Sequence, residues 1–264
     1  MKKVVVISGA SSGIGLETAK LLHKNNYKVY GLSRRKVETN SFFSMQVDVT
    51  KQHQIQKALD EIYQKEKVID ILINNAGMGI SGSVEFTSDE ALDQILNVNF
   101  KGLHHMIKYA LPYLRKSKGK IINVGSVAGP LAIPFQTFYS ASKSMVQTYS
   151  EALAIELKPM SIQVCTVLPG DIKTEFTKNR KKNVNESSIY KHRVDASIGV
   201  MEKDEQHGMT SSYAAKTFLK LCKKRKMPLT KTIGFKYKVF LLLNKILPKR
   251  LVVYIIGKIY GFTK

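Results

Sequence analysis

A tyrosine and a lysine stand four residues apart in the run Tyr139-Ser140-Ala141-Ser142-Lys143. On a helix this spacing places both side chains on one face, one turn apart. An ammonium fixed beside a phenol favours the phenolate and lowers a pKa that is ordinarily about 10. Such a phenol can exchange a proton near neutral pH, as acid–base chemistry at a carbonyl or alcohol oxygen requires. Taken alone, the spacing is more often an ordinary surface pair, so other motifs must decide.

A glycine-rich turn follows the first apolar run of the chain. Residues 4–7 predict a buried strand, and an apolar helical pattern begins at Ile14. The turn and the start of the helix contain Gly9, Ser11, Ser12, Gly13, Ile14 and Gly15. Glycines here let the backbone approach a pyrophosphate, which binds the free N–H groups at the helix N-terminus. A purely structural turn is the alternative, but the flanking strand and helix favour dinucleotide binding.

Basic residues follow the second predicted strand, at residues 28–32. Ser33, Arg34 and Arg35 stand there, with no carboxylate. A carboxylate at this point binds the ribose hydroxyls of NAD, whereas an arginine pairs with the extra phosphate of NADP. The sequence therefore favours NADP(H) over NAD(H). The alternative is that the two arginines are only solvated loop residues.

Strands and helices alternate along most of the chain. Further strands are predicted at residues 44–49, 68–73, 119–124 and 161–167, and helices at 51–65 with Thr50 as N-cap, 89–114, 138–157 and 211–224 with Thr210 as N-cap. The predicted strand at 44–49 ends in Asp48 and Val49, where Asp48 is expected to contact the adenine. Two later strands are followed by Asn75, Ala76 and Gly77, and by Pro169, Gly170, Ile172 and Thr174. The pattern predicts an α/β fold with a doubly wound parallel sheet, a Rossmann fold, in a single domain. Within the helix from Asp89, Asn97, Asn99 and Gly102 are poor helix formers and predict a local kink.

Composition agrees with a globular chain of 264 residues that is 44% hydrophobic and 23% charged. Cys165 and Cys222 lack any paired spacing, which predicts neither a disulfide scaffold nor a metal site and favours a reducing, cytoplasmic location.

Residues 178–264 hold 21 Lys and Arg but 5 Asp and Glu, so 21 − 5 = 16 of the net +22 charges lie there. The basic runs 178–182 and 223–226 are either a solvated face or a contact with an anionic membrane, a nucleic acid or an acidic carrier protein. Nucleic acid is disfavoured because no motif that reads it is present.

Several motifs occur together in one order: Ser8 to Gly15, Asn74-Asn75-Ala76-Gly77, Asn97-Val98-Asn99, Ser126, Tyr139 to Lys143 and Pro169-Gly170. In these the chain resembles the classical short-chain dehydrogenases/reductases over roughly residues 2–176. The resemblance implies that Tyr139 is the general acid in reduction and the base in oxidation, and that Ser126 holds the substrate oxygen. Lys143 would lower the pKa of the phenol and bind the nicotinamide ribose, and Asn99 would hold a water of a proton relay. Ser8 stands where this family usually has threonine.

The cofactor contacts that the resemblance implies are the phosphate turn from Gly9 to Gly15, Asn75 on the adenosine side, and Pro169 to Thr174 around the nicotinamide. The implied activity is NADP(H)-dependent interconversion of a carbonyl and a secondary alcohol, on a hydrophobic, steroid-, retinoid- or acyl-like substrate. A dinucleotide-binding regulator or membrane-surface scaffold without turnover is the alternative, which the intact set Asn99, Ser126, Tyr139 and Lys143 disfavours. A homodimer or homotetramer is also expected, since the family pairs through two long helices, here around residues 92–114 and 139–157.

The chain is predicted to comprise a dinucleotide-binding and catalytic core at residues 1–177, a substrate lid and following helix at 178–230, and a helical extension at 231–264. Residues 183–208 are polar and predict a mobile lid. Apolar blocks of the extension are interrupted by lysines, and none approaches the roughly 20 residues of a membrane span. The extension therefore has three interpretations. It closes a hydrophobic substrate pocket, as in the steroid and retinoid branch; it rests on anionic lipid at a membrane periphery; or it covers the core or a subunit interface.

Overall fold

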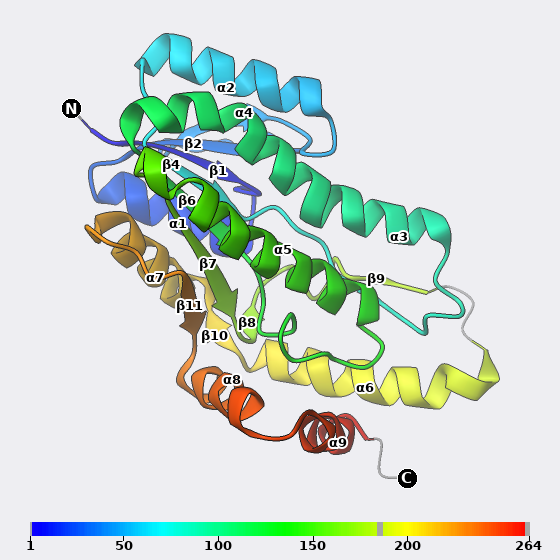
Figure 1. The fold of residues 1–264 in the computed structure, drawn as a ribbon. Helices are drawn as coiled ribbons and strands as arrows, with labels where there is room; N and C mark the ends of the chain where they lie inside the picture. The colour runs from blue at the N-terminus through cyan, green and yellow to red at the C-terminus, as the bar shows by residue number, and fades with distance from the viewer. Residues whose placement is uncertain (1, 184–186, 262–264) are drawn as a thin grey trace.

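A seven-stranded parallel sheet forms the centre of the computed structural model, which describes residues 2–183 and 187–261. Its strands lie in the order β11 (Thr230–Ile233), β7 (Gln163–Pro169), β6 (Lys120–Val124), β4 (Ile71–Asn74), β1 (Val4–Ser8), β2 (Lys28–Ser33) and β3 (Phe43–Gln46). The strand order reverses between β1 and β4, so the sheet is doubly wound (Figure 1). The predicted Rossmann fold is confirmed, and ligands of such sheets bind at the carboxyl ends of the strands beside the reversal.

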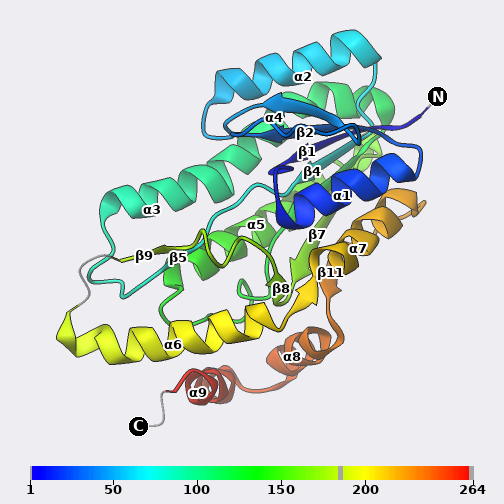
Figure 2. The same ribbon diagram turned by 180° about the vertical axis from the view of Figure 1, so that it is seen from behind.

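Helices cover both faces of the sheet (Figures 1 and 2). They are α2 (Gln52–Glu66), α4 (Gly102–Ser117) and α5 (Thr137–Glu156) on one face, and α1 (Gly13–Lys24) and α7 (Ser211–Lys223) on the other. Successive side chains of a strand point to opposite faces. Val4 and Val6 therefore pack under the first layer, whereas Val5 and Ile7 pack under the second. Burial on both faces explains why β1 reads as a continuous apolar run.

The long helix that begins at Asp89 is interrupted where the sequence predicts a kink. α3 (Asp89–Leu96) passes through a π-helical turn, η1 (Asn97–Lys101), into α4. Ser88 caps its start by accepting a hydrogen bond from the Ala91 N–H. A single π turn inside a helix is frequent at functional sites. Here the turn carries Asn99, which is 1% exposed.

Two local predictions were wrong. The sequence did not predict β11, because only Ile233 of its four residues is buried and no apolar run marks it. This strand also crosses residue 231, so the first residues assigned to the extension belong to the central sheet. Thr50 does not cap α2, which begins at Gln52 after Lys51. The Thr50 hydroxyl instead donates to Asp48 Oδ1 at 2.8 Å.

The segment between the core and the extension is anchored by short parallel strand pairs. β8 (Ile172–Lys173) pairs with β10 (Met209–Thr210), and β5 (Ile80–Ser81) pairs with β9 (Lys181–Lys182). The predicted lid contains the helix α6 (Ser188–Gln206), and its residues 184–186 lie outside the described residues. Thr210 caps α7, as predicted, by accepting from the Tyr213 N–H. A 3-10 turn, η2 (Lys158–Met160), leads from α5 to β7.

Two further helices follow β11 and lie next to α6, outside the two layers that cover the sheet (Figures 1 and 2). They are α8 (Phe235–Ile246) and α9 (Lys249–Ile259). Residues 262–264 of the predicted extension lie outside the described part of the chain. Within that part, no helix has the length and apolar character needed to cross a bilayer.

Candidate functional site

The glycine turn after β1 is held from the neighbouring strand β4. The Asn75 Nδ2 donates to the carbonyl oxygens of Gly9 at 2.9 Å and Ser8 at 3.2 Å. In return, the Ser8 hydroxyl accepts from the N–H groups of Asn75 and Ala76, both at 3.1 Å. Serine in place of the threonine usual in similar proteins therefore keeps the hydroxyl that joins the two strand ends.

No side chain would fit at two of the turn's glycines. Gly9 has φ +69°, and a Cβ there would lie 2.8 Å from Ala76 Cα. A Cβ at Gly15 would lie 2.2 Å from the Gly9 oxygen. The turn is therefore packed closely against β4 while the residues at the start of α1, namely Ser11, Ser12, Gly13 and Ile14, stay partly exposed. A pyrophosphate can bind the free N–H groups at the start of the helix, because the glycines add no side chains that would block it.

The predicted adenosine side lies at the ends of β2 and β3. The Ser33 hydroxyl donates to the Arg35 oxygen at 2.6 Å, which holds the turn after β2. Arg34 and Arg35 are exposed, and neither forms a salt bridge with any residue that the structure describes. Both guanidinium groups are therefore available to an anionic ligand. Asp48 Oδ1 accepts from the backbone and hydroxyl of Thr50, at 2.9 and 2.8 Å, in a local turn.

Tight helix packing places Val49 at the same edge. A Cβ at Gly102 would lie 2.9 Å from the Val49 oxygen, so this glycine lets α4 approach the end of β3. Val49 is buried in the core cluster on that face of the sheet. Its contacts are therefore with protein rather than with open space.

The residues expected to do chemistry converge beyond the end of β6. Lys143, on α5, is 4% exposed, and its Nζ donates to the Val124 oxygen at 2.9 Å. That Nζ lies 5.9 Å from the centre of the Tyr139 ring. Ser126 follows β6, lies close enough to Tyr139 to influence its pKa, and accepts from the Ala128 N–H at 3.1 Å. A hydroxyl, a phenol and an amine thus share one small volume.

Burial shifts the pKa values of both Tyr139 and Lys143. It raises the pKa of Tyr139 to about 12, although the nearby Ser126 side chain acts to lower that pKa. Burial also lowers the pKa of Lys143 to about 8. The net displacement of the Tyr139 pKa is therefore opposite to the direction that the sequence predicts. The physical reason is that the phenol is desolvated while the amine is bound to a backbone carbonyl.

Asn99 ties the loop after β4 to α5. Its Oδ1 accepts from the Met78 N–H at 2.8 Å, and its Nδ2 donates to the Met78 oxygen and the Ser142 hydroxyl, both at 3.0 Å. A Cβ at Gly77 would lie 3.4 Å from both Asn99 Oδ1 and Lys143 Nζ. Gly77 therefore lies between Asn99 and the Lys143 amine. The part of Asn99 in a proton relay stays a prediction.

The segment after β7, predicted to contact the nicotinamide, also contacts the C-terminal extension. A Cβ at Gly170 would lie 2.0 Å from the ring of Tyr237 in α8. The Tyr237 hydroxyl donates to the Asp171 carboxylate. Pro169 ends β7, Ile172 is buried in the core, and Thr174 lies 3.3 Å from where a Gly13 Cβ would be. The glycine turn and this segment therefore face each other across the carboxyl ends of the strands.

Sequence reasoning missed three residues around Tyr139. The ring of Phe176 lies 5.7 Å from that of Tyr139, and the Arg180 guanidinium lies 5.8 Å from the Phe176 ring. Arg180 forms a salt bridge with Glu205 of α6, and its side chain is 1% exposed. The basic run 178–182 is therefore not a uniform surface patch. Nothing in the sequence pairs Arg180 with a carboxylate 25 positions away.

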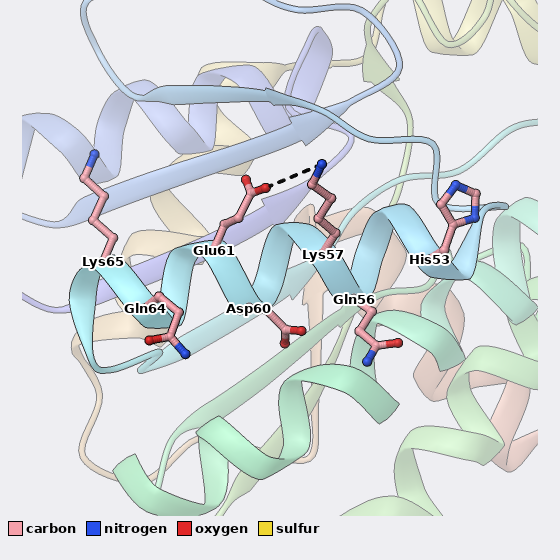
Figure 3. Close-up of a pocket in the computed structure, with 7 residues that line it drawn as sticks. All are labelled: His53, Gln56, Lys57, Asp60, Glu61, Gln64 and Lys65. Carbon is pink, nitrogen blue, oxygen red and sulfur yellow. Dashed lines mark ion pairs between the residues drawn. The ribbon is translucent and has the colours of Figure 1, made fainter.

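A separate hollow lies on α2, and it does not belong to this site. Figure 3 shows seven residues of that one helix around it, with an ion pair between Lys57 and Glu61. These side chains are His53, Gln56, Lys57, Asp60, Glu61, Gln64 and Lys65. None of the predicted site residues lines it. The hollow is the outer surface of a helix and carries no chemistry related to Tyr139.

Comparison with known proteins agrees with this geometry. Residues 3–185 match the family described as short chain dehydrogenase. The chain is 40% identical over 238 residues to the 3-ketodihydrosphingosine reductase of Bacteroides thetaiotaomicron, covering 88% of each chain. It is 32% identical over 200 residues to the NADPH-dependent 1-acyldihydroxyacetone phosphate reductase of Saccharomyces cerevisiae, covering 72% of this chain and 67% of that one.

Among solved structures, a short-chain dehydrogenase from Streptomyces avermitilis superimposes with a TM-score of 0.83 at 25% sequence identity, covering 100% of this chain and 98% of that one. Fold, motif order and sequence similarity agree over the residues that carry the site. The chain belongs to the short-chain dehydrogenase family of oxidoreductases.

Proposed function

We propose that the protein is an NADP(H)-dependent oxidoreductase that interconverts a carbonyl group and a secondary alcohol, with Tyr139 as general acid and base. The observation that carries the proposal is the convergence of Ser126, Tyr139 and Lys143 beyond β6, opposite the glycine turn. A substrate oxygen between the Ser126 and Tyr139 hydroxyls would receive two hydrogen bonds, and the phenol would supply a proton as negative charge develops.

The nicotinamide cofactor, when bound, supplies the hydride. The protein's part is to fix the reacting groups in position and to move the proton. Tyr139 donates its phenolic proton to the oxygen in reduction and takes it back in oxidation. Lys143, at 5.9 Å from the phenol ring, is the nearby cation that stabilises the phenolate when its own amine is protonated. Asn99 is proposed to hold the loop after β4 in place beside Lys143 and to take part in resupplying the proton.

The proposed cofactor preference is for NADP(H). Its support is the exposed pair Arg34 and Arg35 after β2, where no carboxylate is present to bind the ribose hydroxyls of NAD. The yeast relative is named as NADPH-dependent, which agrees. Contacts with the pyrophosphate are assigned to the glycine turn, and those with the nicotinamide side to Pro169, Gly170, Ile172 and Thr174.

The proposed substrate is a ketone or alcohol with a long apolar chain, of the acyl or sphingoid kind. The Bacteroides relative is named for 3-ketodihydrosphingosine. The aromatic ring of Phe176 lies beside Tyr139. The helix α6 adds an apolar cluster of Val194, Ile198 and Met201, with Phe135, Tyr190 and Tyr260 packed against it. Burial of an apolar chain there contributes about 25 cal/mol per Å² of apolar surface removed from water.

The test is turnover by the purified full-length chain. NADPH or NADH is supplied with 3-ketodihydrosphingosine in mild detergent or with a short-chain 3-ketoester, and loss of the reduced cofactor is followed. We expect NADPH to give a kcat/KM about tenfold or more above that of NADH, and the long-chain ketone to be preferred. A rise in melting temperature with NADPH but no turnover of any ketone or alcohol would favour a non-catalytic dinucleotide-binding regulator or scaffold.

The proposal includes a reducing, cytoplasmic location and a homodimer or homotetramer. Cys165 and Cys222 are both buried free thiols, which agrees with a reducing compartment. Pairing is assigned to α4 and α5; on α5, Met145 and Ile155 are exposed apolar side chains. Light scattering of the purified chain at several concentrations tests the assembly.

A further inference from the structure

We propose that α8 and α9 form a docking surface for an anionic lipid membrane, with apolar side chains entering the head-group region and lysines contacting the lipid phosphates. The two helices have one side on the protein and one side in solvent. On the protein side, Tyr237 and Val252 are buried and Tyr260 packs against the apolar cluster of α6. The opposite side is the proposed docking surface, at the end of the molecule where both views show these helices (Figures 1 and 2).

This outer side is apolar to an unusual degree. The apolar and aromatic side chains at least 40% exposed are Phe235, Val239, Phe240, Leu242, Leu243 and Ile246 of α8, and Leu251, Val253, Tyr254, Ile255 and Ile259 of α9. Phe235 reaches 79% and Ile246 reaches 68%. Exposed apolar residues elsewhere in the described chain are scattered, whereas these lie on two consecutive helices. Single exposed apolar residues need no explanation, but a contiguous set marks an interaction surface.

The charges around these apolar residues are all of one sign. Six basic residues lie on the two helices: Lys236, Lys238, Lys245, Lys249, Arg250 and Lys258. After Glu205 the chain has no Asp or Glu, while residues 206–264 contain 14 Lys and Arg. Apolar side chains flanked by lysines on a short helix are typical of helices that lie in the plane of a membrane surface. Anionic lipid supplies the charge that this surface lacks.

A second copy of the chain fits this surface poorly. Most protein dimers are twofold symmetric and place the same patch of both copies face to face. Such a contact would bring the basic residues of one copy against those of the other with no carboxylate between them, and like charges in an interface oppose binding. Asp171, an acidic neighbour of α8, is already engaged by Tyr237 and by Lys236 at 3.7 Å.

The surface lies beside the candidate site. Tyr237 of α8 contacts Gly170 and Asp171, and Tyr260 at the end of α9 contacts the α6 cluster. Docking would therefore hold the substrate side of the enzyme against the bilayer. The inference goes beyond the proposed function and does not depend on it, since binding to lipid needs neither cofactor nor turnover.

The test is flotation of the full-length chain with phosphatidylcholine vesicles that contain about 30% phosphatidylglycerol, and with pure phosphatidylcholine vesicles, without cofactor or ketone. We expect binding to the anionic vesicles that is at least about tenfold tighter than to the neutral ones and is weakened at high salt. The variant Leu242→Gln/Ile246→Gln/Val253→Gln/Ile259→Gln should lose binding. Leu229→Gln, at a residue before β11 that is 46% exposed, should bind as the unchanged chain does.

A second pair of variants separates local charge from net charge. Lys238→Gln/Lys245→Gln/Arg250→Gln should weaken binding on the order of 100-fold, because each basic residue near an anionic surface contributes about fivefold. Lys24→Gln/Lys51→Gln/Lys158→Gln removes the same charge elsewhere and should retain most of the affinity. Equal binding by all variants overturns the proposal. So does a change from oligomer to monomer in the apolar variant with vesicle binding unchanged, which would assign the surface to a second copy.

Discussion

Tyr237 of the C-terminal extension donates its hydroxyl hydrogen bond to the carboxylate of Asp171, and the same ring covers Gly170. Asp171 lies two residues beyond the end of β7, in the segment expected to contact the nicotinamide. Burial raises the pKa of Asp171, while this hydrogen bond acts to lower that pKa. The extension is therefore joined to the candidate site by a polar contact as well as by apolar packing.

Replacing Tyr237 by phenylalanine should destabilise the protein by about 1.5–3 kcal/mol, the usual contribution of a hydrogen bond to a charged group. Chemical unfolding measures the change. Tyr254→Phe is the control, because Tyr254 lies on α9 with 55% exposure and should change stability by less than about 0.5 kcal/mol. In an Asp171→Asn background the effect of Tyr237→Phe should shrink. Equal effects in both backgrounds would show that the Tyr237 hydroxyl does not act through the Asp171 carboxylate.

Tyr139→Phe should lower turnover by about 10² to 10⁴ while cofactor affinity stays within a few-fold, because the change removes a proton and leaves the ring. Steady-state kinetics and titration with NADPH measure the two quantities separately. Tyr149→Phe is the matched control on the same helix, where the lost hydroxyl contacts His104 Nδ1 at 3.1 Å. A fully active Tyr139→Phe enzyme would refute the assignment of the general acid.

The sequence alone was enough to predict the elements that depend on residues close together in the chain. The apolar run of β1, the glycine turn and the four-residue spacing on α5 each depend on neighbours in the chain, and each lies where it was expected. The kink near Asn99 was also predictable, since poor helix formers cluster there. Roles of individual residues in binding and catalysis remain predictions.

What could not be predicted depends on contacts between distant segments. Arg180 lies in a run of basic residues and becomes buried only because α6 brings Glu205 to it. β11 carries no periodic apolar signal and exists because β7 offers a free edge for it. The pKa of Tyr139 depends on how much water the folded chain excludes, so the spacing to Lys143 gave the wrong direction.

The exchange of both Arg34 and Arg35 for glutamine should weaken NADPH binding about 10- to 100-fold, since one charge-assisted hydrogen bond to the phosphate contributes about 1.5–3 kcal/mol. NADH lacks that phosphate, so its affinity should change little. Melting-temperature shifts with each cofactor report the difference. Arg115→Gln, an exposed change near the end of α4, serves as control. Equal loss of affinity for NADPH and NADH would mean that the arginines do not bind the extra phosphate.

Lys143 should make stability depend on pH. Its folded pKa of about 8 lies below the ordinary 10.5, so between these values the unfolded chain holds a proton that the folded chain has lost. Stability therefore rises with pH across this window, by up to about 3 kcal/mol, and the cost of burying the charged amine is fully present below pH 8. The raised pKa of Tyr139 acts oppositely and only above about pH 10.

Urea unfolding of the unchanged chain and of Lys143→Met, at several pH values between about 8 and 10, measures this contribution. The difference in unfolding free energy between the two should change with pH by about 2–3 kcal/mol. Lys101→Met, at an exposed residue of the π-helical turn, should run parallel to the unchanged chain. Parallel curves for Lys143→Met as well would mean that its amine titrates normally in the folded state.

Removing one partner of the buried ion pair between Arg180 and Glu205 should lower the unfolding free energy strongly. Replacing both partners together should lower it much less. Glu205→Gln leaves a guanidinium with 1% exposure of its side chain and no counter-charge, which ordinarily costs about 3–5 kcal/mol. Arg180→Met leaves the carboxylate with the Thr177 hydroxyl, which donates to it at 2.6 Å. The double variant Arg180→Met/Glu205→Gln should be destabilised by much less than the sum of the two single changes.

The neighbouring pair Lys182 and Glu202 provides the control from the same two segments. Its atoms lie 2.8 Å apart, but the side chains are 52% and 28% exposed, so breaking it should cost no more than about 1 kcal/mol. The buried pair should also act on Tyr139, because Arg180 lowers the phenol's pKa and Glu205 raises it. Glu205→Gln should therefore shift the alkaline limb of the kcat profile to lower pH, and Lys182→Met should not. An unshifted profile with the stability loss intact would reduce the pair to a purely structural role.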